Sequence, residues 1–331
     1  MLARRANFGD KRGMSLQPSA PSSSPQPCPV APGRADARTR DPAQDRSRTR
    51  GLRDGLLGVL IFSASLPATR LAVVDLPPLF LTGARAVLAA LLAVLVLAGV
   101  RAPRPARGDL LPLAVVAAGC VLAFPLLTAL ALRELSAARA MVFTGLLPLA
   151  TAACAVWRGG ARPRPVFWLC ALAGAACVGA YALALDASAS GAGDALMAAA
   201  VLGCGAGYAE GARLTPRLGG WQVICWALVL AVPAMALLTW ATWPADLSTV
   251  RPSAWAGLAY VSVFSMLVGF VFWYRGLARG GVAAVSQLQL LQPFLGLGLA
   301  AVLLGEPVRP AMVATALAVI ACVAAARRWA R

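Results

Sequence analysis

Hydrophobic residues form long runs from residue 55 onward, and short breaks rich in Pro, Gly or Arg separate these runs. Ten runs are distinguishable, and most approach the roughly 20 residues that a helix needs to cross a bilayer. The pattern therefore predicts an all-α integral membrane protein with about ten transmembrane helices. The runs are 55–73, 78–100, 110–132, 137–157, 165–185, 194–214, 221–243, 254–274, 282–304 and 311–326.

The segment before the first run has a different composition. Residues 1–52 are rich in Pro, Ser, Ala and Arg, and Phe8 is their only aromatic residue. Such a segment buries too little apolar surface to offset the entropy of an ordered chain. We expect a disordered basic tail, with no apolar core of the kind that marks a cleavable secretory signal.

The basic residues are unevenly distributed. The chain has 30 Lys and Arg against 13 Asp and Glu, for a net charge of +17. In a soluble protein this excess would suggest nucleic-acid binding, but here it falls in the tail and in alternate loops. This distribution predicts both termini on the cytoplasmic side of an inner membrane, with lipid and a small-molecule solute as partners and no nucleic acid. The loop residues on that side include Arg101, Arg104, Arg107, Arg158, Arg162, Arg164, Arg213, Arg217, Arg275 and Arg279.

Several kinds of chemistry lack their usual residues. The chain has no histidine, its eight cysteines show no CxxC spacing, and no GxxxxGK[ST] loop is present. We therefore predict no metal and no cofactor. The composition also disfavours an ATP-driven pump or an enzyme acting within the membrane.

An internal repeat appears when the chain is shifted by 145 residues. Residues 53–188 and 189–331 are then two copies with five predicted helices each. Because five is odd, the second copy would enter the membrane upside down, an arrangement typical of secondary transporters. The superposed pairs include Pro148 with Pro293, Gly160 with Gly305, Arg164 with Arg309 and Pro165 with Pro310.

These features resemble the EamA-type carriers of the drug/metabolite transporter superfamily. The resemblance rests on the five-plus-five helices, on Arg85, and on the stretch from Leu291-Gln292-Pro293 to Leu303-Leu304-Gly305-Glu306-Pro307. It covers residues 54–328, although Gly160-Ala161-Arg162 stands where the family often has Gly-Glu-Arg. The resemblance implies a ten-helix inner-membrane carrier, commonly an exporter of amino acids, other metabolites or drugs.

Two ionisable residues inside the runs are candidates for function, because burying a charge in a bilayer is costly. Arg85 lies about eight residues into the second run. We interpret it as a ligand for a carboxylate or phosphate of the solute, or as a structural hydrogen-bonding residue. Glu210 is either a protonatable coupling group or an interfacial carboxylate paired with Arg213.

The ninth run carries three glutamines, Gln287, Gln289 and Gln292. In an α-helix Gln289 and Gln292 would share a face, whereas Gln287 would lie about 200° around from Gln289. They are candidate substrate ligands, with hydrogen bonding between helices as the alternative.

Two prolines and two aromatic residues complete the candidate site. Pro148 and Pro293 are expected to interrupt their helices near mid-membrane and to free carbonyl groups for a polar solute, or to be ordinary kinks. Trp273 and Tyr274 end the eighth run and line a vestibule or belong to an aromatic belt.

The sequence therefore favours a secondary active transporter with alternating access between two inverted repeats. We expect an exporter of a small metabolite, an amino acid-like solute or a drug. A non-transporting membrane regulator or subunit is the alternative, and an intramembrane enzyme is a third. A homodimer is compatible with all three.

Overall fold

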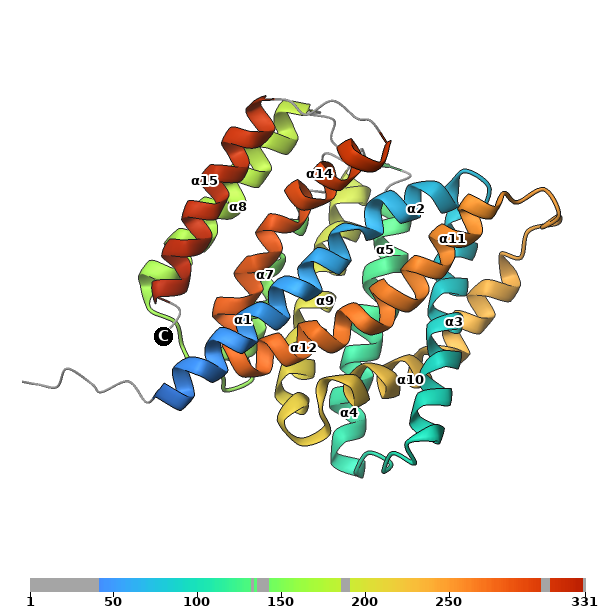
Figure 1. Cartoon of the computed structure of the whole chain (residues 1–331), viewed down its shortest axis with the longest axis horizontal. Coiled ribbons are helices and arrows are strands. Elements are labelled where there is room, and N and C mark those ends of the chain that lie inside the picture. The colour runs from blue at the N-terminus through green and yellow to red at the C-terminus, as the bar shows by residue number, and fades with distance from the viewer. Residues whose placement is uncertain (1–41, 132–133, 136–142, 186–190, 305–309, 330–331) are drawn as a thin grey trace, which may run out of the picture. The chain divides into compact units, whose positions relative to one another are not determined.

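The computed structural model describes residues 42–131, 134–135, 143–185, 191–304 and 310–329, and all regular secondary structure within them is helical (Figure 1). The first half contains α1 (Pro42–Ser63), α2 (Ser65–Val73), α3 (Pro78–Gly99), α4 (Arg107–Val116), the π-helix η1 (Ala117–Ala123), α5 (Phe124–Ala131), α7 (Leu147–Trp157) and α8 (Pro165–Leu185). The second half contains α9 (Gly191–Leu218), α10 (Gly220–Ala241), α11 (Pro252–Tyr260), the π-helix η2 (Val261–Val268), α12 (Gly269–Gly280), α13 (Val282–Ser286), the 3₁₀-helix η3 (Gln287–Leu291), α14 (Gln292–Leu304) and α15 (Pro310–Trp329).

Six helical stretches of the described residues are long and apolar enough to cross a membrane. Shorter apolar helices occupy Leu147–Trp157, Pro165–Tyr181 and Val313–Ala326. The predicted multi-span helical class is therefore confirmed, whereas the count of ten stays a prediction. The six stretches are Arg46–Val73, Pro78–Gly99, Arg107–Ala131, Gly191–Leu218, Gly220–Ala241 and Pro252–Gly280.

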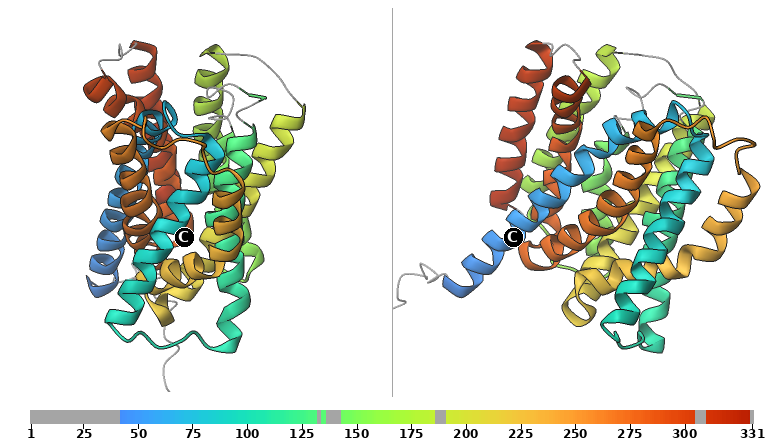
Figure 2. Two further views of the ribbon diagram at one scale, coloured as in Figure 1. Left: turned by 90° about the vertical axis from the view of Figure 1, so that its right-hand side faces the viewer. Right: turned by 45° about the vertical axis from the view of Figure 1, so that its right-hand side comes forward.

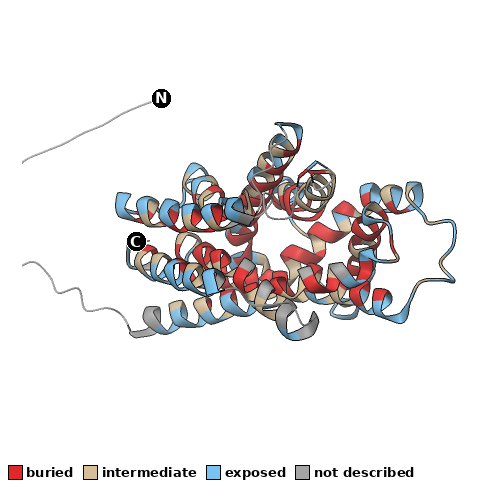
Figure 3. Ribbon diagram, turned by 90° about the horizontal axis from the view of Figure 1, so that it is seen from above, coloured by how far each residue is buried: buried red, intermediate tan, exposed pale blue. Residues whose placement is uncertain are grey.

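The outward faces of these helices are apolar, as expected of a protein whose solvent is lipid. Figure 3 shows exposed residues along the outer sides of helices and buried residues between them. Examples are Leu95, Leu111, Leu169 and Val302, which are 68%, 75%, 67% and 82% exposed. Several of the large exposed side chains at helix ends are tryptophans, including Trp240, Trp243 and Trp329, as in an interfacial aromatic belt.

The start of the first helix corrects the predicted boundary of the tail. α1 begins at Pro42, within the segment expected to be disordered, and residues 1–41 lie outside the described part of the chain. Gly51 explains part of the difference: it is buried, and a Cβ there would lie 2.2 Å from the backbone nitrogen of Gly280. The polar beginning of α1 therefore packs against the end of α12.

Packing between the two halves is reciprocal, and the two views in Figure 2 show the same helix pairs side by side. α1 and α2 run along α11 and α12, and in return α9 runs along η1 and α5. α7 contacts α9, just as α14 contacts α1. α3 packs on α10 and α8 packs on α15, so equivalent runs of the two halves meet.

Glycines allow some of these pairs to approach closely. A Cβ on Gly119 of η1 would lie 2.1 Å from the carbonyl oxygen of Gly203 on α9. A Cβ on Gly276 of α12 would lie 2.6 Å from the backbone nitrogen of Gly55 on α1. Both approaches join one half of the chain to the other, and only glycine fits them without a shift of the backbone.

Irregular helical segments occur at corresponding places in the two halves. The π-helices η1 and η2 superpose, within one residue, when the chain is shifted by the same 145 residues. Pro148 lies in the first turn of α7, just after a turn at Gly145 and Leu146, and Pro293 follows the first residue of α14, just after the 3₁₀-helix η3. At such positions the missing N–H of proline costs little.

Candidate functional site

Arg85 of α3 projects toward η2 and has few partners. Its Nη2 donates to the Oγ of Ser265 at 3.5 Å, the outer limit of a hydrogen bond, and its Nε is buried with no partner. Within the described part of the chain, no carboxylate pairs with this guanidinium. The guanidinium therefore leaves most of its five donors without a partner among the described residues, and its role as a solute ligand or as a structural residue stays a prediction.

Ser265 also joins the two halves through a second hydroxyl. The Oγ of Ser65, on α2, donates to the Oγ of Ser265 at 2.8 Å. Neither serine was predicted as a site residue, because the candidate polar side chains were ionisable or amide groups. Serines within apolar runs were the available signal, but their spacing of 200 residues says nothing about contact.

Gln289 of η3 contacts Tyr208 of α9. Its Nε2 donates to the Tyr208 hydroxyl at 3.3 Å, while its Oε1 is buried without a partner. Gln287 is completely buried, and neither its amide nitrogen nor its amide oxygen has a partner. Gln292, which begins α14, is only partly buried.

The predicted angle of about 200° between Gln287 and Gln289 assumed an α-helix. Residues 287–291 instead form a 3₁₀-helix, which turns about 120° per residue and leaves the two side chains about 120° apart. Both glutamines are buried, as are all residues from 284 to 290.

Trp273 and Tyr274 of α12 lie in an aromatic cluster instead of an exposed belt. Both are completely buried, and the Trp273 ring lies 5.4 Å from the Tyr208 ring and 6.3 Å from the Phe62 ring. The Tyr274 hydroxyl donates to the Sγ of Cys120 at 3.5 Å. The buried Nε1 of Trp273 has no partner, so it is a further unsatisfied donor in this region.

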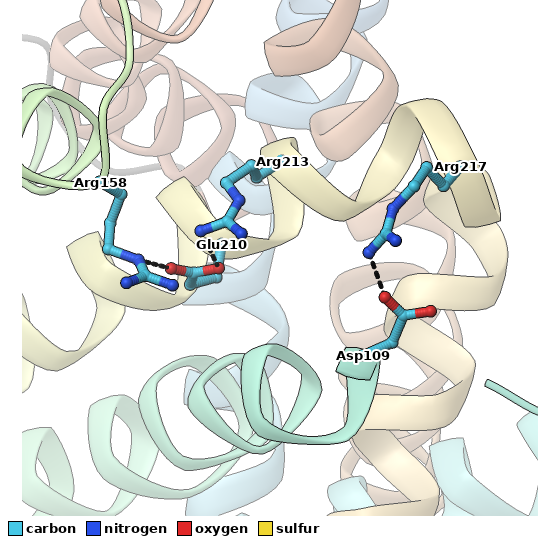
Figure 4. A network of polar contacts seen from close by, with 5 residues as sticks. All are labelled: Asp109, Arg158, Glu210, Arg213 and Arg217. Carbon is cyan, nitrogen blue, oxygen red and sulfur yellow. Dashed lines mark hydrogen bonds and ion pairs between the residues drawn. The ribbon is translucent and has the colours of Figure 1, made fainter. Parts of the chain in front are cut away.

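Glu210 of α9 is buried and held by two arginines (Figure 4). The Nε of Arg158, at the C-terminal end of α7, bonds to its Oε1. The expected contact with Arg213 is present, with 3.5 Å between Nη1 and Oε2, but Oε2 accepts no hydrogen bond. Arg158, the arginine that donates a hydrogen bond, was not predicted as a partner from the sequence.

Two further sets of ion pairs lie at the same end of the helices. Asp109 of α4 pairs with Arg217 of α9, as Figure 4 also shows. Asp54 of α1 pairs with Arg275 and Arg279 of α12, whose nearest nitrogens lie 3.7 Å and 3.3 Å from its Oδ2. We call the end that carries these three sets the charged end. Each set joins the first half of the chain to the second.

Among the residues that the structure describes, an ion pair between Asp75 and Arg251 lies at the opposite end. Asp75, between α2 and α3, accepts from the Nε of Arg251 at 3.0 Å and from the Arg251 backbone N–H at 3.0 Å. Figure 1 shows the α2–α3 connection and α11 at the upper side, and the start of α4 at the lower side. These hydrogen bonds from Arg251 hold the pKa of Asp75 below its ordinary value.

Apolar helices with lipid-exposed faces, and buried polar groups between the halves, define a multi-pass membrane protein of the transporter class. Residues 51–183 and 191–327 each match the model of the EamA-like transporter family, so the chain belongs to that family. The chain is 58% identical over 283 residues to the uncharacterized transporter YdeK of Bacillus subtilis (strain 168), covering 86% of this chain and 99% of YdeK. A solved crystal structure with 18% identity covers 84% of this chain and 98% of its own, with a TM-score of 0.73, and shows the same fold.

Proposed function

We propose that the chain is a secondary active transporter that exports a small solute, either a metabolite, an amino acid-like compound or a drug. One observation carries this proposal: polar atoms of Arg85, Gln287 and Gln289 are buried without partners, in helices from both halves of the chain. Buried polar groups normally find partners within the protein, because an unpaired one is costly. A polar solute bound between the halves would supply these partners.

The reciprocal helix packing supports two inverted repeats of five helices each, at residues 53–188 and 189–331. A two-fold relation between the repeats would pair the first run of each with the third run of the other, and α1 with α12 and α9 with η1 are such pairs. The π-helices η1 and η2 also support a duplication. They lie at equivalent positions when the chain is shifted by 145 residues, as expected if both copies of a duplicated unit kept the same irregularity. In this arrangement one repeat rocks against the other to alternate access.

The proposed solute site comprises Arg85, Gln287, Gln289 and Gln292, with Trp273 and Tyr274 as its aromatic wall. Arg85 would bind a negative group and the glutamines would bind donors or acceptors of the solute. The helix irregularities before Pro148 and Pro293 would free backbone carbonyls beside this site. All these groups lie on helices that contact the other half of the chain.

The charged end is proposed to be the cytoplasmic end, because it carries the loop arginines that the positive-inside rule places there. Its ion pairs tie the repeats together, so they would have to separate when the carrier opens inward. The pair between Asp75 and Arg251 would do the same at the outer end. The protein would then lie in the inner membrane with both termini cytoplasmic.

Glu210 is proposed to couple protons to this motion. Its carboxylate holds Arg158 of the first repeat, and a neutral carboxylic acid would hold that cation much less strongly. Protonation from the cytoplasmic side would thus favour opening of the charged end. Proton exchange against the solute would follow from this coupling.

A resistance screen tests the proposal. Cells with and without overexpression are grown with amino acids, their analogues and cationic drugs, and Arg85→Ala and Gln292→Ala are run beside the unchanged chain. We expect resistance to one class of compound, lost in both variants at equal membrane abundance.

Matched controls are available on the same helices. Leu91→Ala on α3 and Val302→Ala on α14 alter exposed side chains, 57% and 82% accessible, and should keep resistance. If resistance survives both site substitutions, the proposed solute site is wrong. If the protein moves no solute across a vesicle membrane under any imposed gradient, the proposed transport function is wrong.

A further inference from the structure

The hydrogen bonds of Ser265 leave an unusual set of donors around Arg85. The Ser265 oxygen accepts from Nη2 of Arg85 and from the hydroxyl of Ser65. The Ser65 hydroxyl also lies 3.5 Å from the carbonyl oxygen of Ile61, but its 2.8 Å contact with Ser265 is much shorter, so we assign its hydrogen to Ser265. Both lone pairs of the Ser265 oxygen are then occupied, and its own hydroxyl hydrogen is left to donate. The Nε–H of Arg85 is also left to donate, because that atom is buried and has no partner.

The Arg85 guanidinium and the Ser265 hydroxyl have unused hydrogen-bond donors, and the positive charge of Arg85 is not balanced. Ser265 is 4% exposed, the Nε of Arg85 is inaccessible to solvent, and the described residues provide no carboxylate to balance the guanidinium. A buried cation requires an anion or strong acceptors nearby, and the single hydroxyl of Ser265, at 3.5 Å, is a poor substitute. The missing partner is therefore an acceptor with negative charge.

We propose that Arg85 and Ser265, supported by Ser65, form a subsite for a carboxylate group of the transported solute. This inference rests on the proposed function and narrows its substrate class. A planar carboxylate matches the fork made by Nε and an Nη of a guanidinium, and the hydroxyl of Ser265 gives a third donor. A phosphate would carry nearly two charges, which a single arginine balances poorly.

The irregular geometry of η2 contributes to this subsite. Ser262 lies in the same π-helix and is also buried, but its hydroxyl donates to the carbonyl of Leu258 at 2.7 Å. Ser265 makes no such bond to its own helix and turns to α2 and α3 instead. Arg85 and Ser65 belong to the first matched segment and Ser265 to the second. A bound carboxylate would thus contact both halves of the carrier.

The test measures ligand binding separately from flux. The purified full-length chain, in nanodiscs of phosphatidylcholine so that no anionic lipid is present, is heated with butyrate, hexanoate or benzoate. Their neutral amides and inorganic phosphate serve as comparison probes. Binding to the folded state raises Tm with ligand concentration, which gives an apparent Kd. We expect the carboxylates to raise Tm and the amides and phosphate to have little effect.

Variants assign this effect to the subsite. Arg85→Gln should weaken carboxylate binding about 30-fold or more, since the charge-assisted bonds are lost, and Ser265→Ala about 3- to 10-fold. Ser262→Ala should leave it unchanged, as should Arg104→Gln, which removes an exposed arginine. Reconstituted vesicles of the same proteins report flux.

Several results would overturn the subsite. One is that the amides raise Tm as much as the carboxylates do, and another is that phosphate raises Tm more. The others are that carboxylate binding is unchanged in Arg85→Gln, or that no carboxylate shifts Tm at about 50 mM. If another solute crosses the vesicle membrane while no carboxylate binds, the subsite fails and the carrier stands. If carboxylates bind through Arg85 but no solute ever crosses, the subsite stands and the carrier fails.

Discussion

Arg158 and Glu210 are 52 residues apart in the sequence and form an ion pair that joins α7 to α9. Glu210 is buried, whereas the Arg158 side chain is 42% exposed, so solvent screens only one partner. Breaking a fully buried pair costs several kcal/mol, but this exposure reduces the expected cost to roughly 1 kcal/mol. The pair is thus strong enough to bias an equilibrium and weak enough to open.

Glu210→Gln should therefore increase opening of the charged end. An amide does not balance the charge of Arg158, and about 1 kcal/mol corresponds to a roughly fivefold larger open fraction. The measurement is maleimide labelling of buried Cys204 in a chain without other cysteines, applied from the side of the charged end. Arg213→Ala should change the labelling rate less, because that arginine is more exposed and its contact is longer. Equal labelling in the Glu210 variant and the unchanged chain would refute the role of this pair.

The pair between Asp75 and Arg251 predicts a pH dependence of stability. Hydrogen bonds from the Arg251 side chain and backbone depress the pKa of Asp75 below its ordinary value of 3.8. A depressed folded-state pKa stabilises the folded chain above pH 3.8, and this contribution is lost as pH falls through the lower folded-state pKa. Asp75→Asn should lower Tm at pH 6, and the difference from the unchanged chain should shrink toward pH 3. A Tm difference that stays constant over this range would contradict the assignment.

The contact between Gly119 and Gly203 predicts an asymmetric response to alanine. A methyl group on Gly119 would meet the Gly203 carbonyl oxygen at 2.1 Å, whereas one on Gly203 meets nothing nearer than 3.7 Å. Gly119→Ala should destabilise the chain by about 1–3 kcal/mol through overpacking, and Gly203→Ala should be nearly neutral. Thermal unfolding of the two variants in detergent checks this. Similar Tm values for both would show that η1 and α9 are not in such close contact.

Gln287 predicts a conflict between stability and function. Its amide group is buried and unpaired, a state that costs about 1–3 kcal/mol. Gln287→Met keeps the length of the side chain and removes that cost, so Tm should stay the same or rise while solute flux falls. Thermal unfolding and vesicle flux are measured on the same preparation. A marked fall in Tm would mean that the amide has a structural partner and no solute role.

Hydropathy predicted the helical membrane class because long apolar runs admit few other structures, and the family resemblance in the sequence is confirmed by the match of both segments. The local geometry was harder to predict. The 3₁₀-helix at 287–291 and the two π-helices depart from the α-helical period of about 3.6 residues per turn, and counting along one run assumes that period.

Contacts over long sequence distances also escaped prediction. Arg158 and Arg217 were interpreted only as signals of orientation, although each pairs with a buried carboxylate on another helix. Ser65 and Ser265 carry no charge, so nothing in the sequence marked these two serines as site residues. Arg85 and the glutamines were identified because an ionisable or amide group inside an apolar run is itself rare. Their role in solute binding stays a prediction.

The most direct test of alternating access is a reversible cross-link across the charged end. Asp109→Cys and Arg217→Cys are combined in a chain whose eight native cysteines are replaced, and a short bis-methanethiosulfonate reagent joins them. Flux in vesicles is measured for a solute identified by the resistance screen. We predict that the cross-link lowers flux at least about 10-fold, that a reductant restores it, and that either single cysteine treated alone keeps full flux. Unchanged flux in the fully cross-linked protein would contradict the separation of the two halves at this end.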